Sequence, residues 1–210
     1  RATEVEYTTQ SVQYTDATGA TKTANVGKVA DAFIDVRDPI SGSAPDRQQI
    51  EMYDRLKTIY EQTFVRGHLF NDHLGGIGEV YNLFPITYSA NSEHKITAEG
   101  NLKKHVRGEY SSIQGSHTTP TFIRYRVEAI PKQPADITND ASATFRCLMV
   151  SRHNGLPDGK NHEWIIYSDP GKKVSAFGER SSKDDYSNTN LGAFSANDKG
   201  EAASTLSSRI

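Results

Sequence analysis

The sequence has very little cysteine: Cys147 is the only one in 210 residues. A single thiol cannot form an intramolecular disulfide, and it also excludes a zinc site built from several cysteines. The neighbours of Cys147 are apolar, among them Phe145, Leu148 and Val150. We therefore expect Cys147 to pack within a strand rather than to act as a reactive thiol.

Long apolar runs are also missing. No stretch has the length and hydrophobicity of a membrane-spanning helix, and the first residues lack the charged and apolar regions of a signal peptide. These absences predict a soluble protein with no membrane span. The chain opens on Arg1 rather than on methionine, as a fragment or a processed piece of a longer protein would.

Net charge is nearly absent, because 24 Lys and Arg residues face 26 Asp and Glu residues, for a balance of −2. Such a chain has no overall electrostatic attraction for nucleic acid. Binding of a polyanion would need a local basic patch together with a metal ion.

What is present is a polar globular composition, with 35% hydrophobic residues and a mean hydropathy of −0.64. A chain of 210 residues is long enough for one domain with a sizeable core. We predict an α+β fold with an antiparallel β-sheet. Its predicted parts are a β-rich N-terminal part at 1–44, a helix and hairpin core at 45–110, antiparallel strands at 120–180 and a polar tail at 180–210.

The periodicity of apolar residues predicts the elements outside the centre of the chain. Alternating β-forming residues predict a β-meander over 1–40 with a turn at Asp16–Gly19. Apolar residues at intervals of three and four predict a helix from Pro45 to about Gln62, with Pro45 in its first turn. The second half favours strands joined by long loops. The predicted strands are 121–130, 143–150 and 164–167, and the loops are 131–140 and 153–162.

Polar and special-backbone residues are concentrated between Phe64 and Glu99. The pattern predicts a strand at 64–70, a Gly-rich loop at 71–79 and a second strand at 80–86. A helix is expected to begin near Asn91 with Ser89 as its cap, and to end or bend at Gly100. Three glycines of the loop are expected to serve the backbone geometry of the turn. They are Gly75, Gly76 and Gly78.

This stretch has the residues that phosphodiester hydrolysis requires, namely a base, a cation site and positioning groups. His68 follows Gly67 at a strand end, and an imidazole of near-neutral pKa suits a general base. On a regular helix, Asn91 and Glu99 would lie about 80° apart on one broad face. An amide oxygen can bind hydrated Mg²⁺ while a carboxylate holds a metal-bound water. The hairpin and helix together predict a nuclease site.

The segment resembles the core of the DNA/RNA non-specific endonucleases of the ββα-metal (His-Me finger) superfamily. The matching residues cover about 40 positions and are closest to the nuclease domains of bacterial toxins. They are Arg66-Gly67-His68-Leu69, Gly75-Gly76, Asn82-Leu83-Phe84-Pro85, Asn91 and Glu99. The resemblance implies a hairpin-helix ββα-metal core with flanking helices inside the predicted α+β fold.

By this resemblance the chain is a metal-dependent endonuclease that uses Mg²⁺, or another divalent cation such as Mn²⁺. His68 would be the general base and Asn91 the metal ligand. Glu99 would orient the water shell of the metal, Asn82 would support the His68 loop, and Arg66 would lie near the scissile phosphate. Val65 stands where the family often has Asp, so another group would have to orient the site.

The resemblance also implies the biological setting. The substrate would be DNA, with RNA as an alternative, and a cognate immunity protein would be a partner. The domain would be secreted or delivered into a target cell by a bacterial delivery system, where it would act in the cytoplasm as a toxin or effector.

Several charged residues allow two interpretations from the sequence. His94 could bind phosphate, brace Asn91 or be an ordinary exposed helix residue. Lys103 and Lys104 could follow a phosphate backbone, although such charge runs are usually solvated. The remaining histidines favour loop, surface or structural roles over metal binding. They are His73, His153 and His162.

Two other functions are compatible with the sequence. The first is a non-catalytic β-rich binding module that keeps a degenerate nuclease hairpin, which the Val65 substitution and the acidic balance favour. The second is a zinc-dependent hydrolase that would use His68, His73 and His94, although no metal-binding motif sets their spacing.

Overall fold

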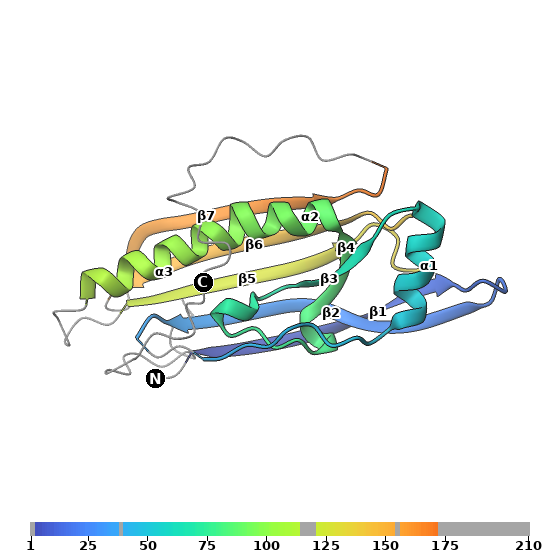
Figure 1. The fold of residues 1–210 in the computed structure, drawn as a ribbon. Coiled ribbons are helices and arrows are strands. Elements are labelled where there is room, and N and C mark those ends of the chain that lie inside the picture. Colours follow the sequence, from blue (N-terminus) through green and yellow to red (C-terminus); the bar gives the residue numbers. More distant parts are fainter. Residues whose placement is uncertain (1–2, 38–39, 114–120, 154–155, 172–210) are drawn as a thin grey trace.

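The computed structural model describes residues 3–37, 40–113, 121–153 and 156–171. These residues form an α+β fold around a five-stranded antiparallel sheet of order β1-β2-β5-β6-β7 (Figure 1). The predicted fold class is therefore confirmed at this level. The strands are β1 (Glu4–Thr15), β2 (Thr21–Asp35), β5 (Thr121–Pro131), β6 (Ala143–His153) and β7 (Leu156–Ser168).

The central segment of the chain packs against this sheet. Helix α1 (Ile50–Tyr60) precedes a two-stranded antiparallel hairpin of β3 (Phe64–His68) and β4 (Leu83–Thr87). A continuous helix follows, in three parts that run along the sheet beside β5, β6 and β7 (Figure 1). These parts are α2 (Tyr88–Glu93), the π-helical turn η3 (His94–Glu99) and α3 (Gly100–Ile113). Two 3₁₀ turns, η1 (Asp72–Leu74) and η2 (Val80–Asn82), lie between β3 and β4.

The core lies between the sheet and this central segment. Along β5 the side chains of Phe122, Ile123, Tyr125 and Val127 are buried, and the register pairs Val127 with Cys147 of β6. Cys147 is fully buried, as its apolar neighbours predicted, and it is a free thiol. No helix within the described residues combines the length and the hydrophobicity needed to cross a membrane.

The turn between β1 and β2 lies where the sequence places it. The Asp16 carboxylate accepts hydrogen bonds of 2.9 Å from the backbone N–H groups of Thr18 and Ala20. Gly19 has a φ of 86°, a left-handed conformation that costs glycine nothing. The hairpin of β1 and β2 confirms the expected N-terminal β-structure.

Helix α1 begins at Ile50, five residues after the predicted Pro45. Gln49 adopts a left-handed conformation with a φ of 56°, which separates the helix from the preceding residues. The backbone of those residues is engaged elsewhere, since Asp46 N donates to Gly78 O at 2.8 Å. Tertiary hydrogen bonds thus override the local signal of Pro45.

The predicted second strand and following helix are also shifted. Residues 80–82 form the 3₁₀ turn η2, so β4 begins only at Leu83. The helix begins at Tyr88, and its cap is Thr87, whose hydroxyl accepts from Ala90 N at 3.1 Å, rather than Ser89. Gly100 keeps helical dihedral angles, so the helix continues through it.

In the C-terminal half, the predicted long loop at 153–162 is wrong, because β7 already begins at Leu156. The strand is therefore longer than its apolar residues 164–167 indicate, since its first part is polar. The predicted polar tail at 180–210 lies outside the described residues.

Candidate active site

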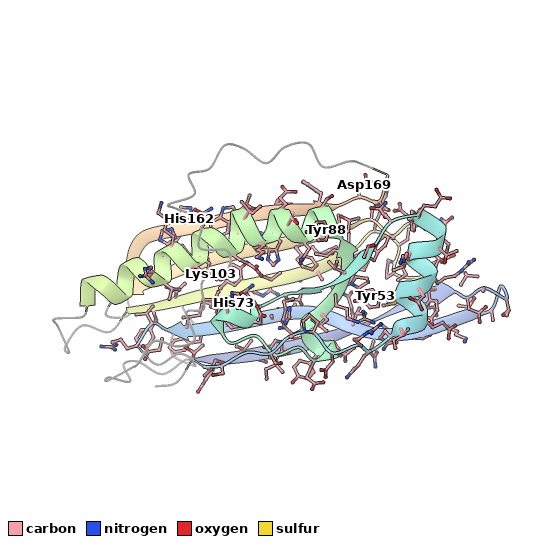
Figure 2. All side chains as sticks on the ribbon, in the orientation of Figure 1. Tyr53, His73, Tyr88, Lys103, His162 and Asp169 are labelled. Atoms are coloured by element: carbon pink, nitrogen blue, oxygen red, sulfur yellow. The ribbon has the colours of Figure 1, made fainter. Side chains whose placement is uncertain are left out.

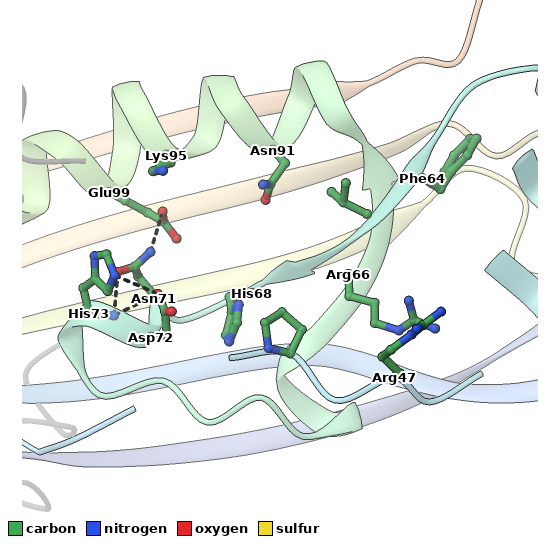
Figure 3. Close-up of a pocket in the computed structure, with 12 residues that line it drawn as sticks. Arg47, Phe64, Arg66, His68, Asn71, Asp72, His73, Asn91, Lys95 and Glu99 are labelled. Carbon is green, nitrogen blue, oxygen red and sulfur yellow. Dashed lines mark hydrogen bonds and ion pairs between the residues drawn. The ribbon is translucent and has the colours of Figure 1, made fainter. Parts of the chain in front are cut away.

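A polar cavity of about 550 Å³ lies between the hairpin, η1 and the helix (Figure 3). It brings together four residues that the sequence singled out, from β3 and from the helix. They are Arg66, His68, Asn91 and Glu99. Further polar side chains complete its wall, and they are Arg47, Asn71, Asp72, His73 and Lys95.

His68 ends β3 and is half-buried in the cavity wall. Its Nε2 lies 3.0 Å from the carbonyl oxygen of Ser43, which can only accept a hydrogen bond. The proton of the neutral imidazole is therefore on Nε2, which leaves Nδ1 as the basic nitrogen. Ser43 is itself fixed by the Gly-rich loop, since its N–H donates to Gly76 O at 3.0 Å and its hydroxyl accepts from Gly78 N at 2.7 Å.

The loop after His68 is held by Asn82, which is fully buried and lies outside the cavity. Its Oδ1 accepts from Phe70 N at 2.8 Å, and its Nδ2 donates to the carbonyls of Phe70 and Ile77 at 2.9 Å. The backbone of Asn82 also accepts from Leu69 N at 2.8 Å. One amide side chain thus connects the two ends of the turn that follows His68.

Close packing explains part of the glycine content of this loop. A Cβ atom on Gly76 would lie 1.7 Å from the carbonyl oxygen of Phe70, which no side chain could tolerate. Gly75 has a φ of 112°, a conformation that favours glycine. Both residues therefore serve backbone geometry, as the sequence predicts.

Arg66 lies on the opposite side of His68 from Glu99 (Figure 3). Its guanidinium carbon is 4.1 Å from the centre of the Tyr53 ring, and its Nε donates to Gln48 O at 3.0 Å. The Tyr53 ring and the Gln48 carbonyl hold the Arg66 guanidinium in place at the cavity wall. Arg47 lines the same end of the cavity.

The helix contributes Asn91, Lys95 and Glu99 to the cavity, all on the side that faces the hairpin (Figure 3). These residues are spaced four apart. The π-helical turn over 94–99 contains the last two of them, Lys95 and Glu99, and such turns are frequent at functional sites. Lys95 was not singled out from the sequence, although its spacing from Asn91 and Glu99 could have indicated it.

Glu99 is buried at 3% exposure, an unusual position for a carboxylate. Its Oε2 accepts from Asn71 Nδ2 at 2.9 Å. Burial raises the pKa of Glu99 to about 7, against the opposing influence of Lys103, of His68 and of the Asn71 hydrogen bond, while Asp72 raises it further. A carboxylate that titrates near neutral pH in a polar cavity is typical of functional sites.

His94 is buried at 1% exposure and is absent from the cavity wall, which corrects the predicted substrate contact and the exposed alternative. Its Nδ1 lies 3.5 Å from Glu99 Oε1 and its Nε2 lies 3.3 Å from Tyr125 Oη. Burial lowers the pKa of His94 to about 3, so the ring is neutral at pH 7. Its partner on the helix is therefore Glu99 rather than Asn91.

The two lysines that the sequence grouped together have different environments. Lys103 is fully buried and its Nζ lies 3.4 Å from His73 Nδ1 (Figure 2), whereas Lys104 is exposed. Lys103 therefore cannot follow a phosphate backbone, which corrects that prediction. Of the remaining histidines, His162 is exposed and stacks on Trp164, and the side chain of His153 lies outside the described residues.

The donor atoms of the cavity are suited to a hard, hydrated cation. They are an amide oxygen of Asn91 and the carboxylates of Asp72 and Glu99. Across the described ranges no cluster of three or more His, Cys, Asp and Glu side chains could hold a metal ion. With His94 turned into the core, the zinc site of His68, His73 and His94 does not form.

Three residues of the site come from segments that the sequence did not connect with it. Ser43 and Arg47 precede α1, and Asn71 follows the Arg66-Gly67-His68 segment by three residues without belonging to a motif of its own. Comparisons with protein-family models, with curated proteins and with solved structures gave no match to this chain.

Proposed function

We propose that this chain is a divalent-cation-dependent endonuclease that hydrolyses the phosphodiester bonds of DNA, with RNA as an alternative substrate. The observation that carries the proposal is the convergence of Arg66, His68, Asn91 and Glu99 on one polar cavity. The hairpin supplies the guanidinium of Arg66 and the imidazole of His68 to this cavity. The helix supplies the amide of Asn91 and the carboxylate of Glu99.

In this proposal His68 is the general base. The Nε2–H group donates to the Ser43 carbonyl, so Nδ1 is available to take a proton from the attacking water. Because Asn82 and the glycines fix the turn after His68, the ring keeps one orientation while it accepts that proton. Such pre-organisation is the usual contribution of a protein to proton transfer.

Asn91 would hold the cation, and Glu99 would hold one of its waters, as the oxygen donor set of the cavity allows. When bound, Mg²⁺ or Mn²⁺ would neutralise the charge that develops on the phosphate. Val65 contributes only apolar surface to the cavity, whereas Asp72 and Glu99 both line it. These two carboxylates take the place of the acidic residue that the family often has at position 65.

Arg66, Arg47 and Lys95 provide the local basic patch that a chain with a net charge of −2 needs for binding nucleic acid. Arg66 lies nearest to His68 in the sequence and shares its strand. We assign it to the scissile phosphate, where a guanidinium can donate two hydrogen bonds to phosphate oxygens. Arg47 and Lys95 would contact the phosphates on either side.

The order of hairpin and helix, together with the motif residues, supports a ββα-metal core of the non-specific endonuclease type. We extend the proposal to the toxin branch that the motif resembles. The domain would be delivered into a target cell, and a cognate immunity protein would protect the producing cell.

The test is the cleavage of supercoiled plasmid by purified protein in the presence of Mg²⁺ and of EDTA, with Mn²⁺ and an RNA substrate as further arms. We expect conversion to relaxed and linear DNA in Mg²⁺ and none in EDTA. Circular dichroism of the same preparations would show that the chelator does not unfold the protein. Inactivity of a folded protein with several divalent cations would refute the proposal and favour the non-catalytic binding module.

A further inference from the structure

Asn71 lies directly before η1 and is buried, at 8% exposure, in the wall of the cavity. Its backbone is held in place, because its carbonyl oxygen accepts from Leu74 N at 3.0 Å and from Gly76 N at 2.8 Å. Its side-chain Oδ1 accepts from His73 N at 2.9 Å and so caps η1. These hydrogen bonds fix both the main chain and the amide group of Asn71.

The orientation of the Asn71 amide follows from these partners. A backbone N–H can only donate, so the amide oxygen has to face His73 and the NH₂ group has to point the other way. That NH₂ group donates to Glu99 Oε2 at 2.9 Å (Figure 3). Both side chains are buried, and a hydrogen bond that a carboxylate accepts is stronger than one between two neutral groups.

Glu99 is contacted from two sides. Its Oε1 lies 3.5 Å from His94 Nδ1, and His94 Nε2 in turn lies 3.3 Å from Tyr125 Oη of β5. Asn71 binds the other oxygen from the hairpin side, three residues after His68. The two oxygens of the carboxyl group therefore have partners on different elements, and rotation of the group would break at least one of these contacts.

We propose that Asn71 is a positioning residue of the candidate site, whose side-chain amide holds the Glu99 carboxylate at a fixed place relative to the hairpin that carries His68. In the proposed reaction His68 and Glu99 act on the same small volume, although they belong to different elements. Misplacement of such a group by about 1 Å can lower a rate by about a hundredfold. The role in cleavage rests on the proposed nuclease function, whereas the hydrogen bond between Asn71 and Glu99 does not.

Two substitutions separate this hydrogen bond from the local role of Asn71. Asn71→Ser keeps an oxygen that can accept from His73 N, but the shorter side chain cannot reach Glu99. Glu99→Met keeps the length of the side chain and removes the acceptor. The matched control is Asn101→Ser, which makes the same exchange at an exposed asparagine two residues after Glu99 on the same continuous helix.

The first experiment is a double-mutant cycle on folding, measured in EDTA by chemical denaturation of the wild type, both single variants and Asn71→Ser/Glu99→Met. We expect Asn71→Ser to lower the folding equilibrium constant about tenfold or more in the wild-type background, and by a much smaller factor in the Glu99→Met background. Asn101→Ser should change it by about twofold at most. Equal effects of Asn71→Ser in both backgrounds would overturn the proposal, because the two residues would not be coupled.

The second experiment does not need a stable Asn71→Ser variant. NMR measures how fast the side-chain amide protons of Asn71 exchange with water in the wild type and in Glu99→Met. We expect exchange in the wild type to be slower by about tenfold or more, because the bond to Glu99 has to open first. Equal exchange rates in the two proteins would contradict the proposal. So would exchange at Asn71 of the wild type as fast as at the exposed Asn101.

The third experiment is plasmid cleavage in Mg²⁺ by the wild type, Asn71→Ser and Asn101→Ser. We expect Asn71→Ser to lower kcat about tenfold or more with little change in the KM for DNA, because Asn71 acts through Glu99 rather than on the substrate. A raised KM with an unchanged kcat would make Asn71 a DNA contact and contradict the positioning role. Inactivity of the wild type would refute the nuclease function, while the first two experiments would still decide whether Asn71 holds Glu99.

Discussion

The candidate site and a second cavity of the described residues differ in chemistry more than in size. The second has a volume of about 710 Å³, larger than the 550 Å³ of the candidate site, and lies between α1 and the turn after β1. Lys22 in this cavity pairs with two carboxylates, since its Nζ lies 2.8 Å from Glu51 Oε1 and 3.4 Å from Asp16 Oδ2. Volume alone therefore does not distinguish the candidate site.

The candidate site, in contrast, holds groups whose environment changes their chemistry. Glu99 is buried with a raised pKa, and the orientation of His68 is fixed by a backbone carbonyl. In the second cavity, hydrogen bonds led by that of the Thr18 hydroxyl lower the pKa of Asp16 to about 2, so this carboxylate stays ionised and structural. Burial and hydrogen bonding, rather than the number of charges, therefore set the pKa of the carboxyl groups in the two cavities.

Among the variants that compare the two cavities, Asn91→Ala should cause the largest loss of cleavage rate. Loss of the only protein ligand proposed for the cation should lower the cleavage rate by about a thousandfold, since a catalytic cation contributes several kcal/mol to transition-state stabilisation. Cleavage rates measured over a range of Mg²⁺ concentrations would check this. Asn91→Asp, which keeps an oxygen ligand, should retain more activity than Asn91→Ala. Equal activity of Asn91→Ala and wild type would show that Asn91 is not the ligand of the cation.

Glu99→Gln should have an intermediate effect and should alter two pH dependences. The amide cannot ionise, so the part of the pH dependence of cleavage that follows the titration of Glu99 near pH 7 should disappear. The folded pKa is raised above the usual 4.5, so the native state binds more protons than the unfolded state between these pH values. The stability that Glu99 contributes is present below pH 4.5 and is lost as the pH rises to about 7.

The stability part of this prediction is measured by chemical denaturation of wild type and Glu99→Gln between pH 4.5 and 8. The difference in free energy of unfolding should shift in favour of the variant as the pH rises. A difference that is independent of pH would mean that Glu99 has an ordinary carboxyl pKa in the folded protein.

The smallest effect is expected in the second cavity. Lys22→Met and Glu51→Gln break an exposed ion pair, and such pairs contribute little to stability. Plasmid cleavage by both variants should equal that of the wild type within experimental error. A strong loss of cleavage in either variant would show that the second cavity also takes part in cleavage.

The sequence was sufficient to identify those residues of the candidate site that belong to a local sequence pattern. Arg66, His68 and Asn82 belong to a hairpin whose glycines and strand residues are local signals, and Asn91 and Glu99 are spaced along one helix. The sheet was predictable for the same reason, because alternation of apolar residues along 121–130 reports a half-buried strand directly.

The other parts depend on contacts between distant segments. Ser43 reaches His68 across 25 positions, and Asn71 reaches Glu99 across 28. No local pattern encodes such contacts. The π-helical turn likewise has no simple sequence signal. His94 within it and Lys103 in α3 are buried, although the sequence favoured surface positions for them. Charged residues on a helix are usually solvated, so the tertiary packing of this helix overrode a sound general expectation.

Whether the polar cavity around His68 cleaves nucleic acid is decided by the rate at which His68→Ala cleaves plasmid DNA in Mg²⁺. The matched control is His73→Ala, which removes the other histidine of the same cavity. We predict a loss of about a thousandfold for His68→Ala with an unchanged circular dichroism spectrum, and a much smaller loss for His73→Ala. Cleavage by folded His68→Ala at the wild-type rate would show that His68 is not the general base and that this cavity is not the site of cleavage.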